Sequence, residues 1–363
     1  MPQSLTIDEF LNAPGVMLDV RSPGEYAQGH IPGAISFPLF NDEERAQVGI
    51  CYKQKGPDQA VELGFAIAGP KTVNFLREAK RLATDKLVRL HCWRGGMRSC
   101  AVAWVLEMGG LQVSILEAGY KAFRRWVRAT LTTPKPILVL GGMTGSAKTD
   151  ILRALAVQEA QVLDLEGLAN HRGSSYGALG MPPQPSTEHF ENLLAMAWRM
   201  FHTQSPIWIE AESRNIGACR IPEELFEQMK QAPAIAINRS LEERLTLLVD
   251  RYGEANPEDL IAATERIRKR LGGQRTQAAI ALIREAKLKE ALAILLTYYD
   301  RAYQHDLERR QQQIPTVDVT GLSDEESAQL LRQKVRFYGS GVGGAGGAGE
   351  AGEAGGAGEA GNT

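Results

Sequence analysis

The sequence is poor in cysteine, and none of its four cysteines stands in a CxxC pair. Cys51, Cys92, Cys100 and Cys219 show no regular spacing, which argues against a disulfide scaffold and against a structural zinc site. Long apolar runs are also lacking, since no stretch approaches the roughly eighteen residues of a membrane-spanning helix. The first residues do not have the charged and apolar regions of a signal peptide. We therefore expect a cytoplasmic protein without a membrane segment.

The chain lacks an excess of charge of either sign. Its 41 Lys and Arg residues nearly balance its 43 Asp and Glu residues, for a formal net charge of -2. This balance excludes a protein that binds nucleic acid through its overall charge, so any nucleic-acid surface is expected to be a local patch. The 363 residues are enough for two domains with full hydrophobic cores.

The C-terminal segment lacks apolar bulk. Residues 339–363 are almost entirely Gly, Ala and Glu. Such a composition has nothing to bury, so we predict a disordered tail, of natural origin or an artificial linker. It is left out of the predicted fold.

The most informative stretch that is present is Leu90-His-Cys-Trp-Arg-Gly-Gly-Met-Arg-Ser99, which lies between a predicted strand and a predicted helix. This setting places Cys92 at a helix N-terminus, where backbone amides and the helix dipole favour a thiolate or a bound anion. Arg94 and Arg98 add positive charge, and two glycines let the amides turn inward. We predict a reactive Cys92 rather than a structural cysteine.

Residues 1–131 alternate short predicted strands and helices, which indicates a parallel sheet covered by helices. The stretch from Asp19 to Ala34, DVRSPGEYAQGHIPGA, resembles the N-terminal signature of rhodanese-like domains, in which the cysteine carries sulfur or selenium. The resemblance implies that four signature residues mostly brace the loop beneath the active site: Asp19, Arg21, Glu25 and His30. The cysteine loop also fits His-Cys-x5-Arg, the tyrosine-phosphatase pattern, so a phosphate ester is an alternative substrate.

Residues 132–136 form a short, proline-stiffened linker, and a second α/β domain is predicted over 137–338. An apolar strand leads into Gly141-Gly-Met-Thr-Gly-Ser-Ala-Lys-Thr149 and then a helix, which is the setting of a phosphate-binding loop (P-loop). The residues expected to bind phosphate, with the Thr149 hydroxyl also on magnesium, are Gly142, Gly145, Ser146, Lys148 and Thr149. The pattern has glycine where Ala147 stands, which predicts a crowded loop of weakened affinity. The alternative is a glycine-rich turn without a ligand.

Two further apolar strands, beginning at Gln161 and Ile207, run into polar turns. In a doubly wound sheet both turns emerge beside the phosphate loop. The carboxylates in these turns are predicted either to hold magnesium and its waters or to cap the turns: Asp164, Glu166, Glu210 and Glu212. The residues predicted to meet substrate are His171, Arg172, Ser213 and Arg214.

The predicted helical extension of the second domain spans about 240–310, with helices over 241–252, 257–271, 274–290 and 291–310. It contains a basic cluster: Arg266, Arg268, Lys269, Arg270 and Arg275. Contact with a tRNA backbone and a solvated helix face are equally favoured interpretations of this cluster. Tyr298, Tyr299 and Tyr303 are predicted to stack on an unpaired base or, as is commoner at this spacing, to lie in the core.

Over roughly residues 5–335 these motifs together resemble one family, the bacterial tRNA 2-selenouridine synthases. The similarity includes DLEGLANHRGS from Asp164, ESRNIG from Glu212 and VGICYKQKG from Val48. It implies that the sulfur of wobble 2-thiouridine in a tRNA anticodon stem-loop is replaced by selenium from selenophosphate. It also implies an S-geranylated intermediate made from geranyl diphosphate, and a selenophosphate-producing enzyme as a further partner.

The resemblance assigns a role to each loop. Geranyl diphosphate is expected at the phosphate loop, with Lys148 and Thr149 on its diphosphate and magnesium as a candidate cofactor. Cys92 is expected either to carry selenium as a perselenide, the role we favour from the sequence, or to position selenophosphate. Two alternatives stay open: a cysteine-dependent phosphatase with a nucleotide-binding second domain, and a non-catalytic tRNA-binding sulfur-relay protein.

Overall fold

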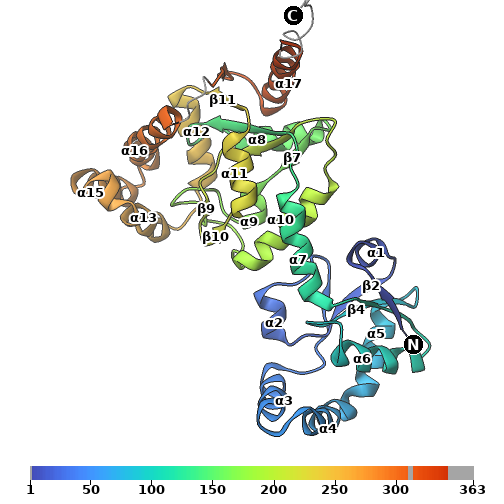
Figure 1. Ribbon diagram of the computed structural model, residues 1–363. Helices are drawn as coiled ribbons and strands as arrows, with labels where there is room; N and C mark the ends of the chain where they lie inside the picture. The colour runs from blue at the N-terminus through green and yellow to red at the C-terminus, as the bar shows by residue number, and fades with distance from the viewer. Residues whose placement is uncertain (1, 310–313, 342–363) are drawn as a thin grey trace, which may run out of the picture.

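The computed structural model describes residues 2–309 and 314–341, and it describes side chains through residue 303 and from 314 to 335. Two α/β domains lie end to end, and helix α7 (Gly119–Thr132) joins them (Figure 1). Each domain has a five-stranded sheet whose strands all pair in parallel. The predicted α/β fold class is therefore confirmed.

The sheet of the N-terminal domain has the strand order β1-β5-β4-β2-β3, which puts β4 in the middle. Its strands are β1 (Gln3–Leu5), β2 (Val16–Asp19), β3 (Ile35–Ser36), β4 (Leu87–His91) and β5 (Gln112–Leu116). Its helices before α7 are α1 (Ile7–Asn12), α2 (Pro23–Gln28), α3 (Asp42–Lys55), α4 (Pro57–Ala68), α5 (Thr72–Leu82) and α6 (Met97–Met108). Because β4 is flanked on both sides, the loop after it, with Cys92, emerges from the centre of the sheet.

The sheet of the C-terminal domain has the order β12-β11-β6-β8-β7, again with the functional strand, β6, in the middle. Its strands are β6 (Ile137–Gly142), β7 (Gln161–Leu163), β8 (Ile207–Glu210), β11 (Ala234–Asn238) and β12 (Thr316–Asp318), beside a small hairpin of β9 (Asn215–Ile216) and β10 (Cys219–Arg220). Its helices are α8 (Lys148–Val157), α9 (Leu165–Ala169), α10 (Thr187–Met200), α11 (Glu223–Gln231) and α17 (Asp324–Gly341). As expected, the turns after β7 and β8 lie at the same edge as the phosphate loop.

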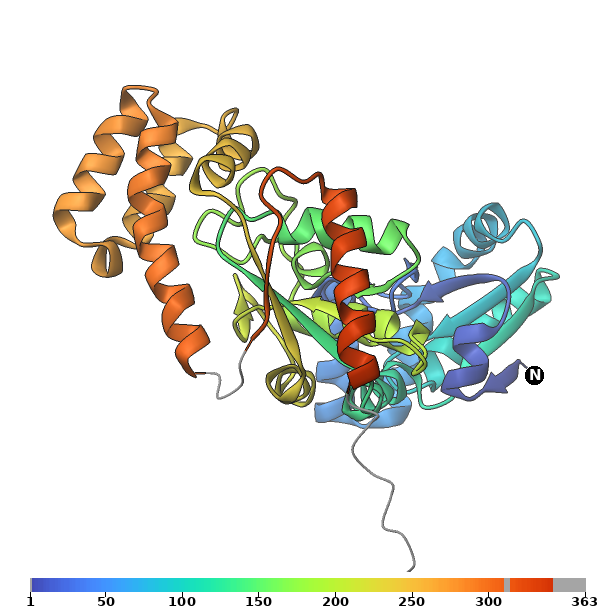
Figure 2. The ribbon, with the colours of Figure 1, turned by 90° about the horizontal axis from the view of Figure 1, so that it is seen from above.

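The helical extension forms a small bundle with its own core, on the side of the C-terminal sheet opposite the N-terminal domain (Figure 2). Its helices are α12 (Leu241–Tyr252), α13 (Pro257–Arg266), α14 (Arg268–Leu271), α15 (Gly273–Arg284) and α16 (Leu288–Arg309). Two predicted boundaries are wrong. The helix expected over 257–271 breaks at Ile267, and the break expected at 290 lies at Ala286, whose φ of 58° ends α15. Because alanine favours helices, the sequence gives no sign of a break at Ala286.

The two domains share one hydrophobic core across α7 and α10. Phe123 of α7 and Phe190 and Trp198 of α10 belong to the same buried cluster, which continues into both sheets. The predicted linker is held in place as well, because Lys135 Nζ donates to the Trp198 carbonyl at 2.6 Å and Trp198 Nε1 donates to the Thr133 carbonyl at 3.2 Å. The linker is thus a fixed part of the junction.

Helix α17 continues to Gly341, so the domain end predicted at residue 338 is a few residues too early. The predicted disordered tail spans 339–363. Its residues 339–341 are the end of α17, and residues 342–363 lie outside the described residues. Within the described ranges, no helix combines the length and the apolar character needed to cross a bilayer.

Candidate active site: two anion-binding loops

The first loop follows β4 and is fixed to the start of α7. The amide of Tyr120 donates to the Cys92 carbonyl at 2.8 Å, and the amide of Lys121 donates to the Trp93 carbonyl at 3.0 Å. Gly95 has a φ of 64°, and a Cβ there would lie 2.6 Å from the Leu116 carbonyl oxygen. The loop therefore needs glycine at this position, and its close contact with α7 fixes the position of Cys92.

Cys92 is almost fully buried, with 3% of its surface exposed. Burial raises the pKa of its thiol, but hydrogen bonds from Ser99 and the Arg94 amide, together with the charge of Arg98, more than offset this effect. The Cys92 Sγ lies 3.3 Å from the Ser99 Oγ. The pKa of Cys92 is consequently below its usual value, as predicted for a reactive thiolate.

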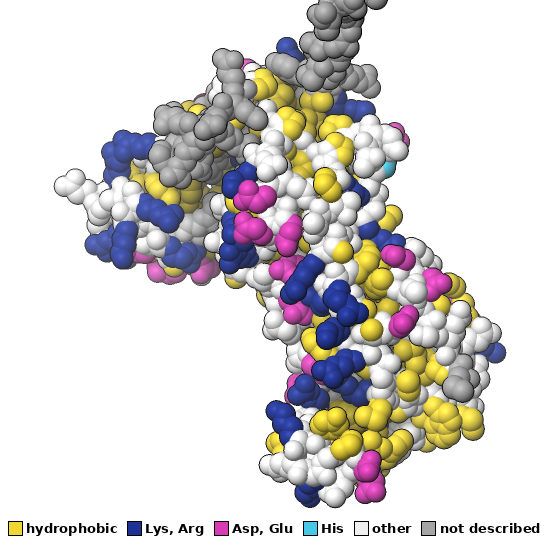
Figure 3. Space-filling model, viewed as in Figure 1, with side chains coloured by type: hydrophobic (Ala, Val, Ile, Leu, Met, Phe, Trp, Pro, Cys, Tyr) yellow, Lys and Arg dark blue, Asp and Glu magenta, His cyan; other side chains and the backbone are white. Residues whose placement is uncertain are grey.

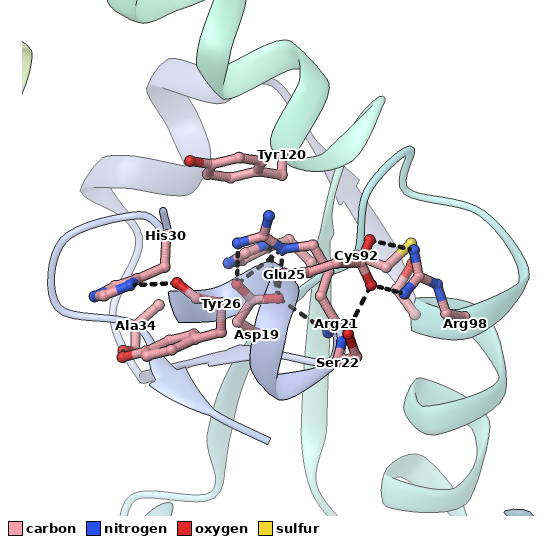
Figure 4. Close-up of polar contacts among 12 residues, drawn as sticks. Asp19, Arg21, Ser22, Glu25, Tyr26, His30, Ala34, Cys92, Arg98 and Tyr120 are labelled. Atoms are coloured by element: carbon pink, nitrogen blue, oxygen red, sulfur yellow. Dashed lines mark hydrogen bonds and ion pairs between the residues drawn. The ribbon is translucent and has the colours of Figure 1, made fainter. Parts of the chain in front are cut away.

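Arg98 and Arg94, both predicted to act on an anion, differ in their surroundings. The Arg98 Nη1 lies 2.7 Å from Glu25 Oε2 (Figure 4). The Arg94 side chain, in contrast, is exposed to solvent. Burial raises the pKa of Glu25, but Arg98, the Ser22 amide and Arg45 together lower it, so the carboxylate stays charged. Glu25 therefore reaches the cysteine loop directly, beyond the bracing role that the signature implied.

The other signature residues brace the segment around α2. Arg21 forms a buried ion pair with Asp19, donates to the Gly29 carbonyl at 2.7 Å and stacks 3.7 Å from the ring centroid of Tyr120. His30 lies at the domain junction, where its ring stacks on His189 of α10. These contacts fit the bracing role for Asp19 and Arg21.

The second loop connects β6 to α8 with the backbone of a phosphate-binding loop. Gly142, Gly145 and Ala147 all have positive φ, of 156°, 83° and 65°. Ala147 thus adopts the left-handed conformation that glycine prefers, at a cost of about 1 kcal/mol. Lys148 Nζ donates to the Gly142 carbonyl at 2.7 Å. The Ala147 methyl group therefore adds strain, but the backbone still has the conformation of a phosphate-binding loop.

Two buried carboxylates, Glu166 and Glu210, and the half-buried Glu212 surround Lys148 at the predicted edge of the sheet. Thr149 Oγ1 donates to Glu166 Oε2 at 2.9 Å, and the Glu166 amide donates to Glu210 Oε1 at 2.7 Å. Burial raises the pKa of Glu210 well above its usual value, and burial with the Glu166 charge raises that of Glu212 to about 8. Burial lowers the pKa of Lys148, although all three carboxylates oppose this shift.

The donor set beside Thr149 suits magnesium only in part. Within the described residues, no three His, Cys, Asp or Glu side chains are grouped as a metal site. Magnesium is commonly held by one or two protein oxygens together with substrate phosphates and waters. The Thr149 hydroxyl and the Glu166 carboxylate fit that arrangement.

The remaining candidates of the two turns mostly stabilise the turns themselves. Asp164 accepts the amide of Gly167 at 2.7 Å, which is the contact that the capping alternative predicts. Arg172 Nη1 donates to the Leu179 carbonyl at 2.8 Å. Ser213 Oγ donates to a carbonyl two residues on, and Arg214 forms an ion pair with a glutamate of α11. The structure does not bring Arg172, Ser213 or Arg214 into contact with the phosphate loop.

His171, the fourth substrate candidate, is held by close packing. It is nearly buried between two glycines, since a Cβ on Gly177 or Gly217 would lie 2.7 Å from its ring. Burial and the nearby charge of Arg266 lower its pKa, so its ring is neutral at pH 7. Its Nδ1 makes no hydrogen bond to the described residues.

Comparison with known proteins identifies the family. Residues 135–335 match the family model of the tRNA 2-selenouridine synthase AAA domain, and residues 6–125 match that of the rhodanese-like domain. The chain belongs to the tRNA 2-selenouridine synthase family. It is 37% identical over 341 residues to the tRNA 2-selenouridine synthase of Marinobacter nauticus, which covers 84% of this chain and 91% of the relative.

Two other tRNA 2-selenouridine synthases show the same extent of similarity. The protein of Hydrogenovibrio crunogenus is 37% identical over 345 residues, covering 86% of this chain and 94% of its own length. The protein of Cronobacter sakazakii is 38% identical over 341 residues, covering 82% and 88%. The similarity therefore includes both loops in one chain.

This member of the tRNA 2-selenouridine synthase family also contains a residue of the phosphate loop region that the sequence did not reveal. Arg244 of α12 is buried, donates through Nε to the Thr144 carbonyl at 2.9 Å, and forms an ion pair with Asp300 of α16. It connects the helical extension to the phosphate loop. Its place in an amphipathic helix gave no local signal of this contact.

An exposed basic face on α7 was also overlooked, although the sequence contains its signal. Lys121, Arg125 and Arg128 stand at positions i, i+4 and i+7, which share one face of a helix, and all three are exposed. Figure 3 shows Lys and Arg side chains gathered on the face where α7 joins the domains. We call these three residues the α7 basic face.

The predicted tRNA-binding cluster divides into two kinds of residue. Arg266 donates to the Ser175 carbonyl at 2.7 Å, Arg268 lies 3.4 Å from Glu265, and Arg270 donates to the Tyr298 hydroxyl at 3.2 Å. Lys269 and Arg275 are exposed on the surface of the extension. Of the three tyrosines, Tyr298 and Tyr299 pack against the core of the extension, whereas Tyr303 lies close to Gly141.

Proposed function

We propose that this enzyme replaces the sulfur of wobble 2-thiouridine in tRNA by selenium, in two steps that use the two loops in turn. Family membership supports tRNA selenation as the overall activity. The observation that carries the division of labour is that one chain holds a thiol of lowered pKa and a lysine in a phosphate loop, in two domains that share one core at their junction.

The first proposed step is alkylation at the phosphate loop. The thiocarbonyl sulfur attacks C1 of geranyl diphosphate, a C–S bond forms, and the C–O bond to the diphosphate breaks. Lys148 and the loop amides stabilise the departing diphosphate through charge and hydrogen bonds. A magnesium ion on Thr149 and Glu166 would supply further charge neutralisation. This step requires no nucleotide hydrolysis.

The second proposed step is displacement at the cysteine loop. The Cys92 thiolate attacks C2 of the alkylated uridine, and geranylthiolate leaves and takes up a proton. The selenium of selenophosphate then attacks C2 and releases Cys92, after which water cleaves the Se–P bond to give phosphate. Both displacements are redox-neutral. A perselenide on Cys92 would require two electrons to be removed, and neither co-substrate accepts them, so we replace the carrier role by nucleophilic attack.

Exposed positive charges on two parts of the chain support a position for the tRNA. The α7 basic face (Lys121, Arg125 and Arg128) begins next to the cysteine loop, and Lys269 and Arg275 extend the positive surface on the helical extension. Lys and Arg side chains neutralise backbone phosphates and supply affinity that does not depend on sequence. We propose that the anticodon stem-loop lies along α7.

Mass spectrometry of nucleosides from 2-thiouridine tRNA tests this function. Geranyl diphosphate alone is expected to give the S-geranyl nucleoside, and both co-substrates together the 2-selenouridine. Selenophosphate alone is expected to give no product, so selenation without geranyl diphosphate would contradict the alkylated intermediate. A chain that binds this tRNA and gives neither product would be a relay protein.

A second measurement separates the two roles of Cys92. S-geranylated tRNA without selenophosphate is expected to give a covalent tRNA adduct on Cys92, detected by denaturing electrophoresis and peptide mass spectrometry. Labelled selenium bound to the protein in the absence of tRNA would instead favour the carrier role.

A further inference from the structure

The N-terminal domain contains a large apolar cavity that the two-loop scheme does not use. Its volume is about 640 Å³, within the roughly 300–1,000 Å³ typical of small-molecule sites. Helices α3, α4, α5 and α6 enclose it, and its walls are almost entirely hydrophobic, with Phe40, Val61, Phe75 and Val105 among them.

Several large apolar side chains at this cavity remain exposed to solvent. Tyr52, Phe65, Met97 and Trp104 line it and expose 54%, 64%, 65% and 64% of their surface. Figure 3 shows hydrophobic side chains gathered over this end of the domain. Soluble proteins seldom leave such a group of aromatic and aliphatic side chains uncovered, and where they do it marks a binding site.

One end of the cavity reaches the cysteine loop. Met97, Arg98 and Cys100, from the first turn of α6, belong to its lining. Arg98 is the residue whose charge lowers the pKa of Cys92, and its guanidinium contacts Glu25. A ligand that fits this cavity has an extended hydrocarbon body and a polar end beside Arg98, at the edge of the cysteine loop.

We infer that this cavity binds the geranyl group of the S-geranylated uridine during the displacement at Cys92. The inference rests on the proposed function, and it assigns the hydrocarbon to the N-terminal domain while the diphosphate of the first step stays at the phosphate loop. Burial of the ten-carbon chain favours binding of the alkylated tRNA over its unmodified precursor. The chain also directs C2 toward Cys92.

The assignment explains how the leaving group departs. When the C2–S bond breaks, the sulfur departs with the chain still bound in the cavity, and the proton it takes up completes the thiol. An apolar wall keeps water away from C2 during the exchange, so selenium rather than water completes the substitution. Hydrolysis to the ordinary uridine is thereby suppressed.

The test compares two tRNAs, one with S-geranyl-2-thiouridine and one with S-methyl-2-thiouridine, each incubated with selenophosphate. The wild-type protein is expected to convert the geranyl substrate at least tenfold faster than the methyl substrate. Ala101→Trp on α6 and Ala68→Trp on α4 each place a large side chain in the cavity lining and are expected to remove this preference by slowing the geranyl substrate. Geranylation from geranyl diphosphate is expected to persist in both variants.

Met108→Trp is the matched control, because Met108 lies on the same helix, is 74% exposed and does not line the cavity. It is expected to keep the wild-type preference. An equal loss on both substrates in both filled variants, an intact preference, or a loss of geranylation instead would overturn the inference. A wild-type dimer that Ala101→Trp dissociates in sedimentation would assign the cavity to a second copy of the chain. A wild-type protein that converts neither substrate contradicts the proposed function itself.

Discussion

The cysteine loop and the phosphate loop are built on the same backbone plan. Each follows the central strand of a five-stranded parallel sheet and runs into a helix, α6 or α8. Each contains a residue of positive φ at a tight turn, Gly95 in one and Ala147 in the other. The plan directs backbone amides at one point, where they favour negative charge.

The charges around the two loops differ. At the cysteine loop the Glu25 carboxylate pairs with Arg98, and hydrogen bonds and the Arg98 charge lower the pKa of Cys92, so the loop stabilises a thiolate. At the phosphate loop, Glu166, Glu210 and Glu212 surround the half-buried Lys148. An incoming anion there meets excess negative charge unless protons or a cation compensate. Under the proposed function, the same backbone arrangement activates a nucleophile in the first domain and receives a charged leaving group in the second.

The largest expected effect is that of Cys92→Ala, which removes the anion that the first loop stabilises. Selenium incorporation is expected to fall by roughly 10³-fold or more, as for loss of a nucleophile. The geranylated nucleoside is expected to accumulate, because the phosphate loop is intact. Nucleoside mass spectrometry with both co-substrates measures both products. If geranylation disappears as well, the two loops do not act separately.

Lys148→Ala is the reciprocal change and is expected to lower geranylation by roughly 10²–10³-fold, the usual cost of losing one group that stabilises a departing anion. Selenation of tRNA that already carries the S-geranyl group is expected to remain, because this substrate needs no diphosphate chemistry. Rates of the two half-reactions, measured with separate substrates, check the prediction. A loss of selenation on pre-alkylated tRNA would place Lys148 at both steps.

A smaller effect is expected from Ser99→Ala, which removes a hydroxyl 3.3 Å from the Cys92 sulfur. Since hydrogen bonding by Ser99 helps to lower the pKa of Cys92, the variant is expected to raise that pKa. In the wild type the thiolate persists as the pH falls below the usual thiol pKa, and it is lost only at the lowered pKa. The pH dependence of Cys92 alkylation, followed by peptide mass spectrometry, is expected to shift upward.

Cys100 is an internal reference for this measurement, because burial and the charge of Cys92 raise the pKa of its thiol. It is expected to react at higher pH than Cys92 in the wild type. Ser213→Ala, which alters a remote turn, is the matched control and is expected to leave the Cys92 profile unchanged. An unchanged profile in Ser99→Ala would assign the lowered pKa to the backbone amides and Arg98.

The sequence predicted both loops because their signals are local. Strand, glycines and helix start stand within about ten residues at Cys92 and at Lys148, and the apolar runs before them fix the strands. Glu166 and Glu210 were also predicted, since parallel strands end at a common edge. The capping role of Asp164 was one of two alternatives, and only its contact with the Gly167 amide favours it.

Contacts between distant segments were not predictable in the same way. Arg244 reaches Thr144 across 100 positions, and Glu25 reaches Arg98 across 73. Periodicity describes which face of a helix is apolar, but it does not say which loop a buried arginine meets. The apolar cavity was missed for the same reason, because four helices enclose it and none of them has an unusual pattern alone.

The smallest expected effect concerns the turn residue that differs between the loops. Gly95 meets the requirement of positive φ without strain, whereas Ala147 at 65° costs about 1 kcal/mol. Ala147→Gly is therefore expected to tighten diphosphate binding by up to roughly fivefold, the equivalent of that strain. Isothermal titration with inorganic diphosphate checks this result, with Ala156→Gly at the far end of α8 as the control. An unchanged affinity would mean that the loop keeps its strain in both the free and the bound state, so that the methyl group is tolerated where the phosphate binds.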